Sequence, residues 1–302
     1  MKLHSEATVK AGEQSRREFL MRAAALVPGA ALFPRALQDT LLVTDRTIIL
    51  KRFADGAEEH LFSLPMGDLV AAMGRSFLGR PYEANTLEAA GPERLVVNLR
   101  EFDCVTLCET SLALARAIKL RASTAEDYER QLEKIRYRGG RCGGYGSRLH
   151  YFSEWIDDNE RKHVVRNMTA ALGGVKEPGG LDFMSTHRDA YPRLADPGDF
   201  AAIVAMEHAL RGRTRFSVPK ERVAQIEEKI RTGDIIAITT DVSGLDVAHT
   251  GIAVREEGVT KLLHAPNVGK QVQITSGSLA AYLAAHRAQS GIMVARPLDP
   301  SA

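Results

Sequence analysis

The sequence predicts an α+β fold with an antiparallel sheet, because helical patterns come first along the chain and consecutive short strands follow them. Apolar residues recur every three or four positions across 104–121, and the stretch 66–80 has the same helical period. Beyond Gly233 the chain changes to short β-rich runs separated by glycine, aspartate and asparagine. Of the 302 residues, 44% are hydrophobic and 26% are charged, which supplies enough apolar side chain for a sizeable core.

The expected elements follow in chain order. After the two helices above, the apolar period predicts helices over 131–137, 149–161, 201–210 and 217–231, the last with Ser217 as its N-cap. The glycine-rich pieces 139–146 and 173–180 are expected to be loops. The β-rich runs predict strands at 234–240, 249–254, 261–265, 271–275 and 292–297, and one helix, 278–287, interrupts them.

The N-terminal segment has the order of an export signal. Ser15-Arg16-Arg17-Glu18-Phe19-Leu20 directly precedes a moderately apolar stretch, residues 21–33. This order resembles the twin-arginine signal, which sends folded proteins across the bacterial inner membrane. An amphipathic helix with a chance pair of arginines is the alternative. We expect residues 1–36 to be removed during export by the twin-arginine machinery, and residues 37–302 to form a single domain in the periplasm.

Charge and composition exclude several classes of protein. The net charge is +2, and the leader alone holds three more basic than acidic residues, so the remainder is slightly acidic and unsuited to nucleic acid. The longest apolar run, residues 23–33, is shorter than the roughly 20 residues of a membrane-spanning helix, so no stable membrane span is expected. Three cysteines are too few for a disulfide scaffold, and we expect neither a metal nor a cofactor.

A reactive cysteine is predicted at the start of the helix 104–121. Free backbone N–H groups and the helix dipole would stabilise the thiolate of Cys104, although a cysteine in this position can also be a small buried side chain. His249 and His264 lie on neighbouring predicted strands, where one imidazole could take the thiol proton and the other could orient it. Both histidines could equally be polar residues at strand ends.

Five short motifs occur in an order that resembles the NlpC-type superfamily of papain-like cell-wall peptidases and amidases. They are Gly79-Arg-Pro-Tyr82, Phe102-Asp-Cys-Val105, Gly233-Asp-Ile-Ile236, Ala248-His-Thr-Gly-Ile252 and Leu263-His-Ala265. Further segments, among them Ser147–Trp155 and 183–187, are similar to the branch described as N-acetylmuramoyl-L-alanine amidase-like. The resemblance covers roughly residues 65–297, nearly the whole predicted domain.

This resemblance implies a papain-like fold, in which a helical N-terminal part places the catalytic cysteine at a helix start against a central antiparallel sheet. It makes Cys104 the nucleophile, His249 the general base and His264 the orienting residue, and Tyr82 could be a polar donor beside the thiol. The implied reaction is hydrolysis of the amide between N-acetylmuramic acid and L-alanine in peptidoglycan or muropeptides. The alternatives are a γ-D-glutamyl endopeptidase, which cuts within the stem peptide, and a non-catalytic module that binds muropeptides.

Five further polar residues are candidates for substrate binding because they lie in the segments that are particular to this branch. They are Arg148, His150, Tyr151, Ser185 and His187. A planar guanidinium can pair with a carboxylate of the peptide, which is the role expected of the arginine. Helix capping and local hydrogen bonding would explain the same residues equally well.

The leader hypothesis predicts that changing Arg16 and Arg17 together to lysine traps the precursor in the cytoplasm, because the export machinery reads the arginine pair and not charge alone. Cell fractionation followed by detection of the precursor measures the effect. Normal export of the double-lysine variant would indicate a general secretory route instead.

Overall fold

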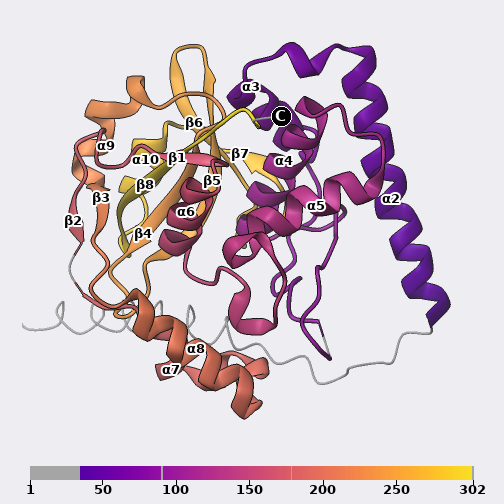
Figure 1. Ribbon diagram of the computed structural model, residues 1–302. Coiled ribbons are helices and arrows are strands. Elements are labelled where there is room, and N and C mark those ends of the chain that lie inside the picture. The colour runs from indigo at the N-terminus through magenta and orange to yellow at the C-terminus, as the bar shows by residue number, and fades with distance from the viewer. Residues whose placement is uncertain (1–34, 90, 178, 301–302) are drawn as a thin grey trace, which may run out of the picture.

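The computed structural model describes residues 35–89, 91–177 and 179–300, and it confirms a mixed α+β fold around an antiparallel sheet. Helices α2 to α6 cover one face of this sheet, and α9 and α10 cover the other (Figure 1). The predicted leader lies outside the described residues up to residue 34, and its boundary at residue 36 falls inside α2. Within the described ranges, no helix is long and apolar enough to cross a membrane.

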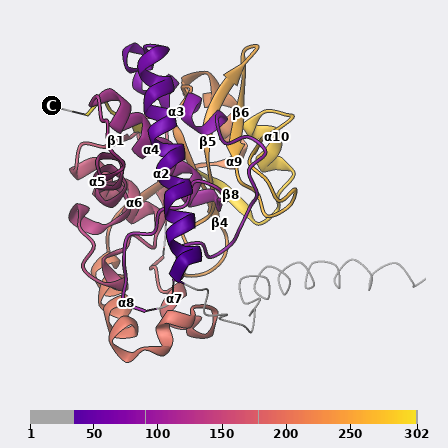
Figure 2. The same ribbon diagram turned by 90° about the vertical axis from the view of Figure 1, so that its right-hand side faces the viewer.

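Each of the seven predicted helices has a counterpart in the structure, but the helix ends differ from the prediction. The structure contains α2 (Arg35–Glu58), α3 (Met66–Arg75), α4 (Cys104–Lys119), α5 (Ala125–Arg136), α6 (Phe152–Arg161), α7 (Phe183–Thr186), α8 (Pro197–Leu210), α9 (Lys220–Ile226) and α10 (Leu279–Ala284). Helix α2 was not expected; it lies over α4 and α5 (Figure 2). Helix α5 begins earlier than predicted because Thr124 and Asp127 form a capping box at its start.

The predicted helix 217–231 is wrong in its first turn. Ser217 does not cap a helix; it lies in a strand, and its hydroxyl donates to the carboxylate of Glu177 on the neighbouring strand. The helix begins three residues later, after Pro219, whose fixed φ suits the position before a helix. Strand pairing therefore outweighs the helical pattern of this short segment.

All strand pairs in the sheet are antiparallel. The strands are β1 (Val165–Asn167), β2 (Val175–Glu177), β3 (Arg215–Pro219), β4 (Ile235–Thr240), β5 (Val247–Glu256), β6 (Val259–His264), β7 (Gln273–Ile274) and β8 (Gln289–Pro297). Their order is β2-β3-β8-β4-β5-β6-β7, and β1 pairs with β8. The five strands expected beyond residue 233 are all present, whereas β1, β2 and β3 were not anticipated.

The central strands are apolar on both faces because each face meets helices. On β4, Ile235 and Ala237 belong to the core beneath α3 and α4, and Ile236 and Ile238 belong to the core beneath α9 and α10. This explains why β4 reads as a continuous apolar run and not as the alternation of a half-exposed strand. A third apolar cluster joins α7 and α8 to the loop 242–245, which leads into β5.

Helix α4 is buried along most of its length, and one charged residue fixes its position. The carboxylate of Glu109 is 2% exposed; it accepts 2.6 Å from Nε of Arg136 on α5 and 3.2 Å from the indole of Trp155 on α6. A buried charge without a partner is costly, so α4 is stable only where both donors reach this carboxylate.

The buried pair predicts that Glu109→Ala lowers the free energy of unfolding by about 3–5 kcal/mol, because the guanidinium of Arg136 would stay buried without its counter-charge. Urea denaturation measures the change. Glu126→Ala is the matched control, since Glu126 forms an exposed ion pair with Arg46, and it should change stability little. Equal effects of the two substitutions would contradict this account of α4.

Candidate active site

The local sequence explains why Cys104 stands at the start of α4. Asp103 is the N-cap: its carboxylate accepts from the N–H of Thr106 at 2.7 Å, and the hydroxyl of Thr106 accepts from the N–H of Asp103 at 2.9 Å. This capping box begins the helix at the next residue, so the Asp-Cys pair sets the cysteine in the first turn. Cys104 as a residue is partly exposed, whereas Cys108, one turn further, is fully buried.

The start of α4 lies against β5, next to the predicted base. Thr250, the residue after His249, lies close enough to Cys104 through its backbone and its hydroxyl to lower the pKa of the thiol, although burial outweighs this effect. The same hydroxyl lies 3.7 Å from the sulfur of Cys108. One threonine therefore faces both cysteines of the helix, and His249 precedes it on the strand that packs against α4.

The two imidazoles meet as the sequence predicted. Nε2 of His249 lies 2.8 Å from Nδ1 of His264, and the ring planes cross at 78°. Strands β5 and β6 are paired neighbours, and the two histidines lie at the same end of this pair. Because Nε2 is occupied by this contact, Nδ1 is the nitrogen of His249 that remains for another proton.

Burial keeps this group of side chains neutral. It raises the pKa of Cys104 to about 11, and the neighbouring carboxylate of Asp103 adds to the rise. Burial also lowers the pKa of His249 to about 3 and that of His264 to about 4. In the resting site desolvation outweighs the favourable hydrogen bonds, which favours a neutral thiol over the thiolate expected from the helix start.

Two tyrosines stand close to the thiol. Tyr82 pairs with Phe102 just before the cysteine, and its N–H donates to the carbonyl of Lys270 at 2.8 Å. Burial raises the pKa of Tyr82, and a negative charge on Cys104 would raise it further. Tyr282 on α10 was missed: its ring centroid lies 5.3 Å from that of His264 and 6.4 Å from that of His249.

Two of the predicted substrate-binding residues just before α6, Arg148 and His150, make their contacts within the protein. Arg148 is 5% exposed; its guanidinium pairs with Glu88 and donates to the carbonyl of Leu87 at 2.9 Å. It holds the segment before α4, and its guanidinium is engaged by carboxylates of the protein; binding of a substrate carboxylate by Arg148 stays a prediction. Nε2 of His150 contacts the carbonyl of Tyr145 at 2.8 Å, and burial lowers the pKa of this imidazole to about 3.

The remaining candidates belong to the α7–α8 region. The hydroxyl of Tyr151 donates to Glu207 at 2.7 Å, and the N–H of Ser185 donates to the same carboxylate at 3.1 Å. The imidazole of His187 stacks on Phe183 and bonds its carbonyl at 3.0 Å. These contacts join α6, α7 and α8, and binding of substrate by these residues stays a prediction.

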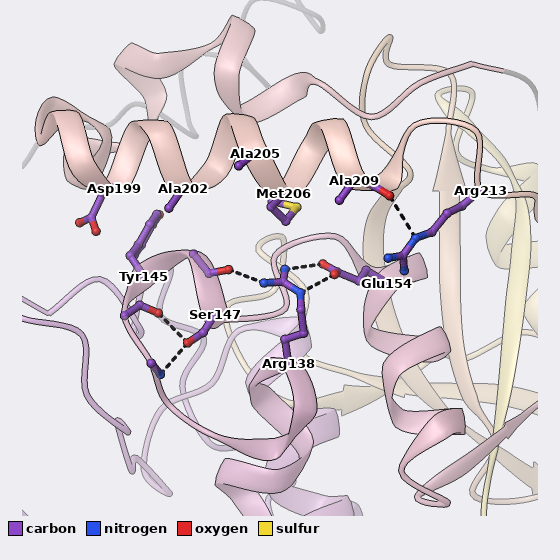
Figure 3. Close-up of a pocket in the computed structure, with 13 residues that line it drawn as sticks. Arg138, Tyr145, Ser147, Glu154, Asp199, Ala202, Ala205, Met206, Ala209 and Arg213 are labelled. Carbon is purple, nitrogen blue, oxygen red and sulfur yellow. Dashed lines mark hydrogen bonds and ion pairs between the residues drawn. The ribbon is translucent and has the colours of Figure 1, made fainter.

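A hollow of about 620 Å³ lies between α8 and the segment 143–147. Figure 3 shows small residues of α8 on one side and Tyr145 and Ser147 on the other, with Arg138 joined to Glu154 between them. The residues that line it are Arg138, Gly143, Gly144, Tyr145, Gly146, Ser147, Glu154, Asp199, Ala202, Ala205, Met206, Ala209 and Arg213. Arg148 and His150 both contact Tyr145, so the branch-specific segment shapes the wall of this hollow.

One buried carboxylate connects the α6 region to the catalytic strand. Asp246 accepts from the N–H of Ser153 at 2.7 Å and from the N–H of Val247 at 2.8 Å. It therefore holds the first turn of α6 against the first residue of β5, two residues before His249. Among the residues that the structure describes, no three histidine, cysteine or acidic side chains gather in a way that could hold a metal.

Comparison of this chain with known proteins shows the family to which it belongs. Residues 72–292 match the AmiA-like family, which is described as N-acetylmuramoyl-L-alanine amidase-like. A crystal structure of an N-acetylmuramoyl-L-alanine amidase from Bacteroides uniformis is 37% identical, covers 77% of this chain and 98% of its own, and superposes with a TM-score of 0.73. A structure from Bacteroides fragilis, whose name is that of a xylanase, is also 37% identical, covers 74% and 99% of the two chains, and has a TM-score of 0.70.

A more distant structure, from Legionella pneumophila, shares the fold at 18% identity, with a TM-score of 0.66 and coverage of 87% of this chain and 98% of its own. No curated protein matches the chain in sequence. The family match covers well over half of the chain, and it agrees with the resemblance carried by the five motifs. The chain belongs to the AmiA-like family and is an enzyme of the N-acetylmuramoyl-L-alanine amidase-like kind.

Proposed function

We propose that this protein is a papain-like cysteine amidase that hydrolyses the bond between N-acetylmuramic acid and L-alanine in peptidoglycan or muropeptides. The observation that carries the proposal is the contact between His249 and His264 beside a cysteine at a helix start. Family membership supports the substrate class. The leader supports action in the periplasm after export.

The geometry assigns a role to each nitrogen of the base. In the proposed tautomer the proton of His249 lies on Nε2 and is donated to Nδ1 of His264, which leaves the lone pair of Nδ1 of His249 to accept the proton of Cys104. The sulfur then bonds the carbonyl carbon of the amide. His249, now positively charged, gives this proton to the leaving amine as the C–N bond breaks, and water resolves the resulting thioester with the same base.

The oxyanion formed in both steps needs donors at the same place. The first N–H groups of a helix have no acceptor within the helix, and at α4 the capping carboxylate of Asp103 takes only that of Thr106. The N–H of Cys104 therefore remains to donate to the oxyanion. The phenol of Tyr82 is a second donor near the sulfur, and its raised pKa keeps it protonated.

The chemistry of the site favours amide hydrolysis over cleavage of a sugar chain. Glycoside hydrolases place two carboxylates on either side of the scissile bond. The groups gathered here are one thiol and two imidazoles, and the nearest carboxylate, Asp103, is engaged as a helix cap. A thiol beside a neutral imidazole is a nucleophile and general base of the kind that catalyses acyl transfer.

Because the pKa of Cys104 is raised to about 11 and that of His249 is lowered to about 3, the resting pair is a thiol and a neutral imidazole. We predict that alkylation of Cys104 by a small reagent is slow at mildly acidic pH and rises about tenfold per pH unit through the neutral range, following the thiolate fraction. Peptide mass spectrometry across a pH series measures it, and fully buried Cys108 is the internal control.

Two results would contradict this account of the resting site. Rapid labelling of Cys104 at pH 5 that His249→Ala abolishes would show a preformed thiolate–imidazolium pair. Faster labelling of Cys108 than of Cys104 would remove the nucleophile assignment itself.

The bond cut is tested with an N-acetylmuramoyl peptide as substrate. We expect release of an intact peptide with a new free amino group on its L-alanine, seen by mass spectrometry, and no turnover by the folded Cys104→Ala variant. A D-lactyl peptide, which keeps the scissile amide but lacks the sugar ring, should be a poor substrate, because binding of the sugar would supply energy used at the amide. Recovery of the dipeptide L-Ala-D-Glu would show an endopeptidase instead, and binding without cleavage would show a non-catalytic module.

A further inference from the structure

One nitrogen in the site has no hydrogen-bond partner within the described part of the chain. Nε2 of His264 is buried and unpaired, and the residue as a whole is 1% exposed. Buried polar atoms without a partner are rare in folded proteins and call for a physical explanation. This atom sits on the second imidazole of the catalytic pair, at the end that faces away from His249.

The direction of the hydrogen bond decides what this nitrogen carries. For His249 to act as a base through Nδ1, its own proton must lie on Nε2 and be donated to Nδ1 of His264. A neutral His264 that accepts through Nδ1 must hold its proton on Nε2. Nε2 of His264 is therefore an N–H donor without a hydrogen-bond acceptor among the described residues. The tautomer in which His249 acts as a base is stable only if something nearby stabilises this buried N–H.

The ring of Tyr282 packs against the imidazole of His264. Its centroid is 5.3 Å from that of His264, and the two ring planes are nearly perpendicular at 89°, which is the edge-to-face geometry. An aromatic face carries partial negative charge and accepts weak hydrogen bonds from N–H groups. We propose that the face of Tyr282 accepts the Nε2–H of His264 and thereby fixes the tautomer of the catalytic pair.

Tyr282 is well placed for this role because its ring is held from several sides. Helix α10 is N-capped by Ser278, and Leu279 and Leu283 anchor it in the core. His286 stacks on the tyrosine ring with centroids 4.3 Å apart, and its Nδ1 contacts the carbonyl of Tyr282 at 2.7 Å.

The contact gains strength during the reaction. When His249 takes the thiol proton, positive charge spreads over the pair of imidazoles, and a cation is attracted to an aromatic face. Tyr282 then acts through His264 on the basicity of His249, as a positioning residue. The other titratable groups around the pair are Cys104 on α4, Tyr82 before it, and His286 on α10. This role rests on the proposed cysteine mechanism.

The test compares Tyr282→Phe, which keeps the aromatic face, with Tyr282→Leu, which removes it. We expect the phenylalanine variant to keep kcat within about twofold. The leucine variant should lose about tenfold or more in kcat with KM little changed, as part of the 10²–10⁴ that a general base contributes. Leu283→Ala is the matched control on the same helix: it should lower Tm without changing kcat.

Nitrogen NMR of the resting enzyme, with labelled histidine, gives a readout that needs no turnover. Wild type and the phenylalanine variant should show His264 protonated on Nε2 and His249 on Nε2, and Tyr282→Leu should mix the tautomers. This separates the proposal from the choice of substrate, since it holds even if another bond is cut. Unchanged tautomers and kcat in Tyr282→Leu, or an equal loss in Tyr282→Phe, would overturn it; so would an equal loss of kcat in Leu283→Ala.

Discussion

The position of the thiol of Cys104, the proposed nucleophile, depends on a buried ion pair on the same helix. Glu109 lies about one and a half turns after Cys104 and is held between Arg136 and Trp155. If α4 moved along or about its axis, this carboxylate would lose its donors at a cost of several kcal/mol. Apolar packing alone tolerates small shifts because similar side chains can replace one another, whereas a buried charge tolerates few. The pair thus fixes where the start of α4 meets β5.

The strand that meets this helix uses three consecutive residues for three tasks. His249 contacts the second imidazole, Thr250 faces both cysteines of α4, and Gly251 allows close packing within the sheet. A Cβ at Gly251 would lie 2.7 Å from the side chain of Leu262 on the paired strand and 2.9 Å from the carbonyl of Leu263. Any larger residue would push β6 away and take His264 with it. Gly251 therefore helps to keep His264 beside His249, because it allows β6 to lie close to β5.

The arrangement of the candidate catalytic residues could be predicted from sequence because the signal is local: a capped helix start, a strand-end histidine and their motifs. The roles of Arg148 and Tyr151 could not, since their partners Glu88 and Glu207 lie 60 and 56 residues away in the chain. A polar residue in a branch-specific segment looks the same whether it binds substrate or another segment. Tyr282 was missed because one aromatic residue on a short amphipathic helix ordinarily indicates core packing. Strands β1 to β3 escaped prediction because long-range pairing, and not their own pattern, makes them strands.

Burial that keeps Cys104 and His249 neutral also has a consequence if the enzyme acts in the periplasm, as we propose. A thiolate is the form of cysteine that oxidants attack, and the compartment proposed here is an oxidising one. A thiol with a pKa of about 11 resists this chemistry between turnovers. Charge separates only when a bound amide carbonyl takes up the sulfur and helix N–H groups take up the developing oxyanion. The same desolvation that slows attack by small oxidants strengthens those hydrogen bonds, because electrostatic interactions grow as water is excluded. Low reactivity at rest and catalysis on a bound substrate are thus compatible in one site.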